Sequence, residues 1–207
     1  MSAADSVLLV LIACASCVPA SAQQRAVPPA AVLCDSCHGV KGEGLPALNA
    51  PRLAGLQSWY LEKQLKDFRS GVRGGSGFDS NAALMKRIAD SLGGDSAVAE
   101  AAGYIASLPP TPAPVPGVAG SAARGESLFA TCVACHGKSG EGSEATHAPR
   151  LKGANDWYVV RQLEAFKSGR RGADEHDPSG QQMRAIAATI SDEQAMQDLA
   201  AYVGTLE

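Results

Sequence analysis

The stretch Cys34-Asp35-Ser36-Cys37-His38 decides the fold, because it recurs 98 positions later as Cys132-Val133-Ala134-Cys135-His136. The same displacement relates further identical residues, and no gap is needed from Cys34 to Leu108. A match of this extent indicates that the chain is a duplicated domain. The other matched stretches are Pro51-Arg52-Leu53 with Pro149-Arg150-Leu151, Trp59-Tyr60 with Trp157-Tyr158, Gln64-Leu65 with Gln162-Leu163, Ser70-Gly71 with Ser168-Gly169, and Met85 with Met183.

A proline-rich segment separates the two copies. Residues 109–116 read Pro-Pro-Thr-Pro-Ala-Pro-Val-Pro, a composition that favours the extended polyproline II conformation. This segment would span about 25 Å and could run along two packed domains, although a plain flexible spacer also fits the composition. We expect a first domain over residues 23–108, a Pro-rich linker over residues 109–120 and a second domain over residues 121–207.

The first 22 residues have the features of a secretory signal peptide. Residues 7–13 form an unbroken apolar run, and Ala20-Ser21-Ala22 is a cleavage pattern before Gln23. The run is too short to span a bilayer as a helix. Cleavage would give an exported protein, which we expect in the periplasm. A minor alternative is a lipid anchor at Cys14, which follows Leu-Ile-Ala as in a bacterial lipobox.

Helical patterns recur in both copies and predict an all-α fold. In copy one, a helix is expected from an N-cap at Ser58 to Phe68, with Gly71 just beyond its end. The corresponding helix of copy two is expected to be capped by Asp156. The last helix of the chain is expected to begin with a capping box at Ser191. No period-two strand pattern of useful length appears in the sequence.

Composition gives a first indication of a bound group. Hydrophobic residues make up 45% of the chain but aromatic residues only 5%, so the core is poor in large side chains. Small domains with such cores usually need a disulfide, a metal or a cofactor. Two of the six cysteines fall in the expected signal peptide, and the other four form two pairs that each precede a histidine. This spacing argues against a disulfide framework.

Cys-x-x-Cys-His is the attachment signature of c-type haem. Positions i, i+3 and i+4 share one face of a helix, so the motif presents two sulfurs for thioether bonds and an imidazole for the iron. A lone Cys-x-x-Cys could instead be a redox dithiol or half of a zinc site, but each copy has only one such triplet. We predict two covalently bound haems c, attached at Cys34, Cys37, Cys132 and Cys135, with His38 and His136 as axial iron ligands.

The second axial ligand is expected to be methionine. Of the four methionines, only Met85 and Met183 are related by the repeat. Each follows its histidine by 47 residues. Methionine ligation suits a redox-active iron and raises its potential, whereas core packing is the usual role of a lone methionine. The duplicated position favours the ligand role at both irons.

Further residues are candidates for supporting the haems. An axial histidine gives its second ring N–H to an acceptor, here a carbonyl of the loop that follows the motif. Guanidinium groups pair with haem propionates, and an indole either bonds a propionate or packs against the haem edge. His147 and His176 have no histidine counterpart in copy one and are expected on the surface. The supporting candidates are Pro51, Arg52, Trp59, Pro149, Arg150 and Trp157.

The mature chain resembles the di-haem cytochromes c4, a branch of the class I cytochromes c. The resemblance rests on the two motifs, each followed by Gly39 or Gly137, and on the repeated stretches given above. It implies two tandem class I cytochrome c domains, His/Met ligation at both irons and haems that lie close together. It also implies a periplasmic shuttle between a quinol-oxidising complex and a terminal oxidase. Similar modules serve as the electron-accepting subunit of dehydrogenases such as sulfide-oxidising flavocytochromes.

Copy one departs from the resembled family at its first helix. In that family a glycine and an aromatic residue of this helix cross the last helix, and copy two has them as Gly125 and Phe129. Copy one has Val27 and Ala31 at these positions, with Pro28-Pro29 between them. We expect the prolines to limit this helix to about two turns or less. The first domain should therefore have the weaker helix crossing and unfold first.

These features predict an electron carrier and not an enzyme. An enzyme such as a di-haem peroxidase needs an open or exchangeable axial position, which two methionine ligands would remove. An electron-accepting subunit of a dehydrogenase remains an alternative. Residues 23–108 carry nine basic and eight acidic side chains, residues 121–207 carry nine and twelve, and no basic stripe indicates nucleic acid. The expected partners are redox proteins that bind transiently, including a membrane-bound oxidase or reductase, with no small-molecule substrate.

Overall fold

The computed structural model describes residues 26–75, 79–109, 111 and 117–206. The expected signal peptide, its Cys14 and half of the Pro-rich linker lie outside these residues. Within the described part of the chain, no helix is both long and apolar enough to cross a membrane.

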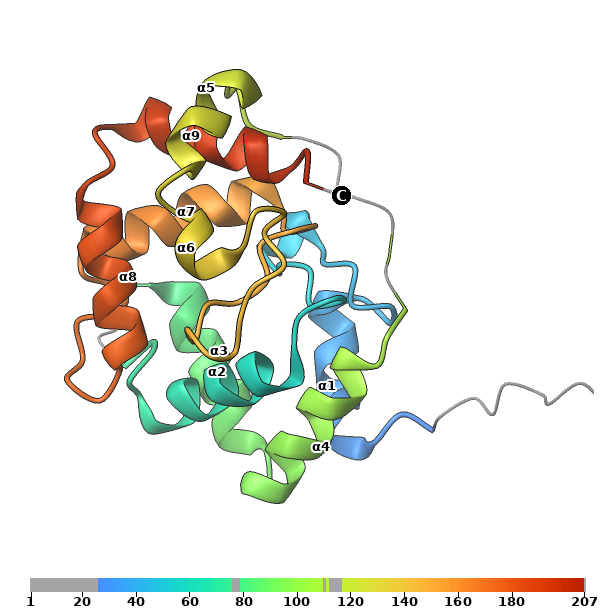
Figure 1. Ribbon diagram of the computed structural model, residues 1–207. Helices are drawn as coiled ribbons and strands as arrows, with labels where there is room; N and C mark the ends of the chain where they lie inside the picture. Colours follow the sequence, from blue (N-terminus) through green and yellow to red (C-terminus); the bar gives the residue numbers. More distant parts are fainter. Residues whose placement is uncertain (1–25, 76–78, 110, 112–116, 207) are drawn as a thin grey trace, which may run out of the picture.

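The described residues form helices and contain no strand, which confirms the all-α prediction. The two copies form two helical domains, with the first in blue and green and the second in yellow to red (Figure 1). Two isolated β-bridges, Leu45–Ala50 and Ser143–Ala148, close the same loop in each domain. Domain 1 contains α1 (Pro29–His38), the 3-10 helix η1 (Pro46–Leu48), α2 (Ser58–Ser70), α3 (Ser80–Ser91) and α4 (Asp95–Ala106). Domain 2 contains α5 (Ala122–Phe129), α6 (Val133–His136), α7 (Asp156–Lys167), α8 (Pro178–Ala188) and α9 (Glu193–Val203).

In domain 2, α5 crosses the last helix α9 at close range (Figure 1). Gly125 permits this approach, because a Cβ atom there would lie 1.9 Å from the Asp198 carbonyl oxygen. Phe129 is 2% exposed, and its ring centroid lies 5.3 Å from that of Tyr202. The predicted crossing through a glycine and an aromatic residue is therefore present in this domain.

In domain 1, α1 packs against α4 with smaller side chains. Ala31 is fully buried where domain 2 has Phe129, and Val27 precedes the helix and is 41% exposed. The expected length of α1 was wrong. The helix starts at Pro29, as the prolines require, but it continues for 10 residues through the haem motif to His38. Proline is tolerated at this first position because its missing N–H would have no partner in the helix. In domain 2 the corresponding segment is divided between α5 and α6.

Two helix starts differ from the sequence prediction. Ser58 and Asp156 are the first residues of α2 and α7, and the N-cap positions belong to Gln57 and Asn155. Neither N-cap side chain caps its own helix, because each bonds the opposite domain. The Arg150 backbone N–H donates to Gln57 Oε1 at 3.1 Å, and the Arg52 N–H donates to Asn155 Oδ1 at 2.7 Å.

The start of α9 is also one residue later than the expected capping box. Asp192, and not Ser191, is the N-cap, and its carboxylate accepts the Ala195 N–H at 2.8 Å. A carboxylate in this position also faces the positive end of the helix dipole, which favours it over a hydroxyl. The predicted helix end at Gly71 is confirmed, since this residue ends α2 with a φ of 85° that glycine adopts without strain.

Candidate functional site

The motif histidine has the same environment in both domains. His38 and His136 are 6% and 8% exposed. The Nδ1 atom of His38 lies 2.7 Å from the Pro51 carbonyl oxygen, and that of His136 lies 2.8 Å from the Pro149 carbonyl oxygen. A carbonyl only accepts, so Nδ1 carries the proton and donates in each pair. The expected proline carbonyl contact is thus present in both copies.

This arrangement leaves Nε2 of each ring unprotonated. Burial lowers the pKa of His38 and of His136 below the usual value, and the hydrogen bond to the proline carbonyl opposes this only in part. Both imidazoles are therefore neutral at neutral pH. A neutral ring with a fixed Nδ1–H and a free Nε2 is the form that coordinates a metal.

The four motif cysteines are free, half-buried thiols. Burial, with a smaller contribution from Asp35, raises the pKa of the Cys34 thiol to about 11, and burial also raises the pKa of Cys132. Cysteines that act as redox dithiols or metal thiolates have lowered pKa values. In addition, the described part of the chain contains no group of three or more His, Cys, Asp or Glu side chains that could hold a metal ion, which argues against the zinc alternative. Thioether formation uses up the thiol altogether.

The repeated methionine and the first motif cysteine pack on one cluster in domain 2 but on different clusters in domain 1, where Cys34 contacts the cluster of Leu61, Ala102 and Ile105. Met85 is half-buried against Leu65, Leu92 and Val98 in domain 1. In domain 2, Met183 packs on the cluster around Phe129 that also holds Cys132. The Trp157 indole N–H is buried without a hydrogen-bond partner in the described part of the chain. Buried donors normally have a partner, so this one fits a ligand carboxylate such as a haem propionate.

The residues of each domain thus fit one covalently attached haem. The two cysteines and the neutral histidine of the motif follow one another in one helical segment, and a later helix of the same domain carries the repeated methionine, half-buried against that domain's hydrophobic residues. The model for cytochrome c matches the chain twice, over residues 30–109 and 122–207. The chain belongs to the cytochrome c family. It binds two haems c covalently, one through each pair of motif cysteines.

Similar proteins narrow the placement of this cytochrome to the di-haem cytochromes c4. The cytochrome c4 structure from Acidithiobacillus ferrooxidans is 30% identical and superposes with a TM-score of 0.67, covering 84% of this chain and 98% of that one. A thiosulfate dehydrogenase electron acceptor from Stutzerimonas stutzeri is 36% identical, over 89% of this chain and 85% of its own. Such relatives support a di-haem electron-transfer cytochrome.

A third relative carries the same module in a longer chain. The structure of thiosulfate dehydrogenase (TsdBA) from Marichromatium purpuratum is 33% identical with a TM-score of 0.66. The similarity covers 83% of this cytochrome but only 36% of that chain. In that protein, a module of this kind is therefore one part of a longer polypeptide.

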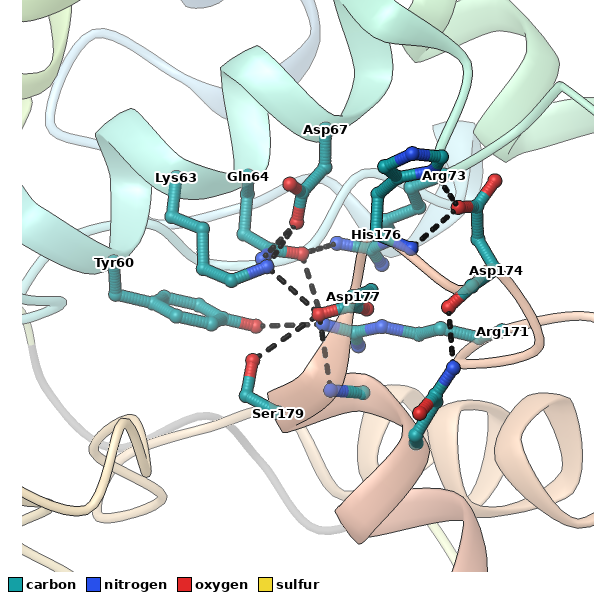
Figure 2. Close-up of polar contacts among 12 residues, drawn as sticks. Tyr60, Lys63, Gln64, Asp67, Arg73, Arg171, Asp174, His176, Asp177 and Ser179 are labelled. Carbon is teal, nitrogen blue, oxygen red and sulfur yellow. Dashed lines mark hydrogen bonds and ion pairs between the residues drawn. The ribbon is translucent and has the colours of Figure 1, made fainter.

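Hydrogen bonds join the two haem domains of this cytochrome, and residues related by the repeat make equivalent bonds in both directions. Arg73 donates to Gln64 of its own domain at 2.6 Å, and to Tyr158 and Gln162 of domain 2 at 3.0 and 2.8 Å. Arg171, its counterpart, makes the equivalent bonds to Gln162 at 2.7 Å, and to Tyr60 and Gln64 at 3.1 and 2.8 Å (Figure 2). The interface is thus self-complementary, like that of a two-fold symmetric dimer.

Two ion pairs at the domain boundary follow the same symmetry. Lys63 bonds Asp177 of domain 2 at 2.9 Å, and Figure 2 shows it reaching Asp67 of its own helix as well. The symmetry-related pair joins Arg161 and Asp79 at 2.7 Å. These contacts fix how the two domains, and hence their haems, are placed relative to each other.

The candidate arginines of the haem loops also lie at the domain boundary. The Arg52 guanidinium donates to the Thr111 carbonyl at 2.7 Å and to the Gly153 carbonyl of domain 2 at 3.3 Å. Burial and the nearby Arg150 both lower the pKa of Arg52. Because the two positive charges repel each other, an anionic group near both guanidinium groups would be stabilised. This is consistent with the predicted propionate role.

The two remaining histidines are exposed, as expected, but one of them has a contact that the sequence analysis missed. His147 lies with its ring 6.5 Å from the Trp59 ring of domain 1. His176 is exposed and bonds Asp174 in its loop. Sequence reasoning also overlooked Arg73 and Arg171. The two arginines are 98 positions apart, like the other repeated residues, and each follows a repeated glutamine, Gln64 or Gln162, by nine positions. This spacing was the signal that could have identified them.

Proposed function

We propose that this cytochrome carries single electrons in the periplasm, accepts them from a dehydrogenase of the thiosulfate-oxidising type, and passes them towards a terminal oxidase. The observation that carries the choice of donor is the similarity to electron acceptors of thiosulfate dehydrogenase, at 36% identity over most of both chains. The relative in which the module continues into a longer thiosulfate dehydrogenase chain supports the same donor. We therefore propose a thiosulfate dehydrogenase, in place of a sulfide-oxidising flavocytochrome, as the dehydrogenase partner.

Single-electron transfer without bond chemistry agrees with the geometry of the two sites. Each domain offers a histidine with a fixed tautomer and a half-buried repeated methionine, two residue types that together would fill both axial positions of an iron. Haem supplies the redox-active iron. The protein contributes the neutral imidazoles, exclusion of water from the sites, and an interface that holds two redox centres at a fixed separation.

Stopped-flow reduction tests the donor. Oxidised cytochrome is mixed with purified thiosulfate dehydrogenase and thiosulfate, and haem reduction is followed by absorbance. We expect reduction that depends on both the dehydrogenase and thiosulfate, and ascorbate serves as a control that both haems are reducible. Reduction by a quinol-oxidising complex but not by the dehydrogenase would favour the second candidate, a shuttle between that complex and a terminal oxidase.

The absence of enzymatic activity is part of the proposal and has its own test. Without a partner protein, reduced cytochrome is mixed with hydrogen peroxide and ascorbate, and oxidised cytochrome is mixed with thiosulfate and ferricyanide as the electron acceptor. We expect no catalytic turnover, because a peroxidase or a thiosulfate-oxidising centre requires an exchangeable axial position. Sustained turnover of either substrate would identify an open haem and overturn the carrier assignment.

A further inference from the structure

The two domains meet through polar side chains, which form what we call the inner surface of each domain. The hydrophobic clusters of the described residues each lie within one domain, so none of them joins the two. The residues of the two inner surfaces are repeat equivalents, 98 positions apart. The inner surface of domain 1 consists of Tyr60, Lys63, Gln64, Arg73 and Asp79, and that of domain 2 consists of Tyr158, Arg161, Gln162, Arg171 and Asp177.

Each of these contacts joins two different positions of the repeat. Arg73 reaches Gln162 and Tyr158 of domain 2, never its own equivalent, and Lys63 reaches Asp177 (Figure 2). If a second copy of domain 1 stood in place of domain 2, the arginine would still meet a glutamine and a tyrosine. The lysine would still meet an aspartate. Because the two inner surfaces carry the same kinds of groups, the hydrogen bonds do not distinguish one domain from the other.

The two ion pairs at the boundary also lack any selectivity between the domains. Specific pairing usually depends on groups that repel the wrong partner. Here both domains carry the cation on the middle helix, as Lys63 in α2 and Arg161 in α7. Both carry the carboxylate at the N-cap of the next helix, as Asp79 of α3 and Asp177 of α8. Opposite charges would therefore face each other in a pair of identical domains as well.

The linker, in contrast, has no counterpart in the repeat. The Thr111 carbonyl is held by Arg52 of domain 1, and the backbone N–H groups of Gly117 and Val118 donate to the Asp156 carboxylate of domain 2 at 2.5 and 3.0 Å. A short covalent connection raises the effective concentration of one domain near the other to the order of millimolar. The linker therefore favours pairing within one chain at lower protein concentrations.

We propose that the inner surface of each domain also binds the same surface of a second copy of this chain, and that the linker alone keeps the pairing within one chain. Two chains then form a dimer in which domain 1 pairs with domain 1 and domain 2 with domain 2. Exchange of equivalent domains is a low-cost route to a dimer, because it requires no new kind of contact. The proposal is independent of which protein donates electrons to the haems.

The test reverses the two boundary charges of domain 2 in the full-length holoprotein. In the double variant Arg161→Asp, Asp177→Arg, like charges face each other within one chain, at Lys63 and at Asp79. In a dimer of two such chains, opposite charges still face each other in the pair of domains 1 and in the pair of domains 2. The quadruple variant, which adds Lys63→Asp and Asp79→Lys, restores opposite charges within one chain and is the matched control.

Sedimentation equilibrium of the three holoproteins gives the dissociation constant of the dimer. We expect that of the double variant to be at least about tenfold lower than that of the wild type or of the quadruple variant, because facing like charges disfavour the closed monomer. High salt should reduce this difference, since the charges are partly exposed and are screened. The net charge and the haem absorbance should be the same in all three proteins.

Cross-linking identifies which domains pair. A carbodiimide joins an amine to a carboxylate that it contacts, without a spacer. In the wild type it should join Lys63 to Asp177 and to Asp67 of its own helix. In the double variant it should join Lys63 to Asp79 of the other chain, which a mixture of unlabelled and isotope-labelled protein reveals by mass spectrometry.

Loss of a helix cap is controlled separately. Asp177 and Asp79 are N-caps, and the quadruple variant loses both caps while it restores the ion pairs. If the double variant fails to incorporate haem, Arg161→Asp alone replaces it and should still dimerise through domain 1, with Arg170→Asp at an exposed position as its control. A reversed variant that remains monomeric at concentrations on the order of millimolar, or a dimer without the link from Lys63 to Asp79, would overturn the proposal.

Discussion

Arg73 and Arg171 each bind the glutamine that belongs to the other, at 2.8 Å in both directions. Each guanidinium also stacks on a phenylalanine of its own domain, with its central carbon 4.5 Å from the Phe68 ring centroid and 4.4 Å from that of Phe166. The stacking holds each arginine in position before it reaches across the boundary. Two copies of one domain are thereby joined as a symmetric pair within a single chain, which sets the separation of the two haems.

Replacement of Arg73 should weaken this junction. Arg73→Ala removes the charged donor of the Tyr158 hydroxyl and one of the two charged donors of Gln64 and Gln162, which keep Arg171. A hydrogen bond to a charged group contributes about 1.5–3 kcal/mol. We expect the free energy of unfolding to fall by about that amount. The single melting transition should broaden or split in differential scanning calorimetry, as the domains lose their coupling.

Two comparisons give this prediction a control. Arg170→Ala removes the same charge from an exposed position beside Arg171 and should change the free energy of unfolding by less than about 0.5 kcal/mol. A double-mutant cycle of Arg73→Ala with Tyr158→Phe should give a coupling energy of about 0.5–3 kcal/mol. A coupling energy of zero would mean that the contact between the domains does not contribute to stability.

Asp198 should make domain 2 sensitive to acid. Its carboxylate accepts the Ser121 N–H at 2.7 Å and pairs with Arg124 at 2.6 Å, which ties the start of α5 to α9. The Arg124 hydrogen bond, followed by that of Ser121, lowers the pKa of Asp198 from 3.8 to about 2. Because the pKa is lower in the folded state, the stabilisation is complete above pH 4 and is lost as the pH falls towards 2.

The corresponding experiment follows the melting temperature between pH 7 and pH 2. Asp198→Asn should lower it at neutral pH and flatten its decline in the acid range. The repeat places Glu100 at the same position in domain 1, where it is exposed, so Glu100→Gln is the matched control and should leave the profile unchanged. An unaltered acid decline in Asp198→Asn would show that other carboxylates determine it.

Domain 1 should open before domain 2. Phe129 fills the crossing of α5 and α9, whereas the smaller Ala31 fills the crossing of α1 and α4. Hydrogen exchange on the full-length holoprotein should show faster exchange of the α1 and α4 amides than of the α5 and α9 amides. Phe129→Ala should cost domain 2 about 3–5 kcal/mol and reverse this order. Slower exchange in α1 than in α5 of the unmodified protein would contradict the prediction.

Met85 and Met183 should each account for one iron ligand. Met85→Ala and Met183→Ala should each halve the near-infrared methionine-to-ferric-haem band of the oxidised holoprotein, and each should lower the reduction potential of one haem only. Met196→Ala is the control, because Met196 is buried in the core of domain 2 but has Val98 as its counterpart. An unchanged band in either ligand variant would remove that methionine from the predicted ligand set.

Local patterns predicted the helices well but their starts poorly. The helix over Ser58–Ser70 and its end at Gly71 follow from sequence spacing, since a left-handed glycine closes a helix wherever it occurs. The N-cap at Gln57 could not be predicted in the same way. Its side chain does not cap the helix. It accepts a hydrogen bond from the Arg150 backbone N–H of the other domain, 93 positions away in the sequence.

The sequence by itself determined the chemistry of this protein, because that chemistry is local. Two cysteines and a histidine share one helical face by their spacing alone, and the exact repeat doubles every such feature. Only the tertiary structure decided how the copies meet. The paired arginines and the crossed amides of Gln57 and Asn155 depend on which surfaces pack together. Spacing along the chain does not determine those contacts, because they join residues that folding alone brings together.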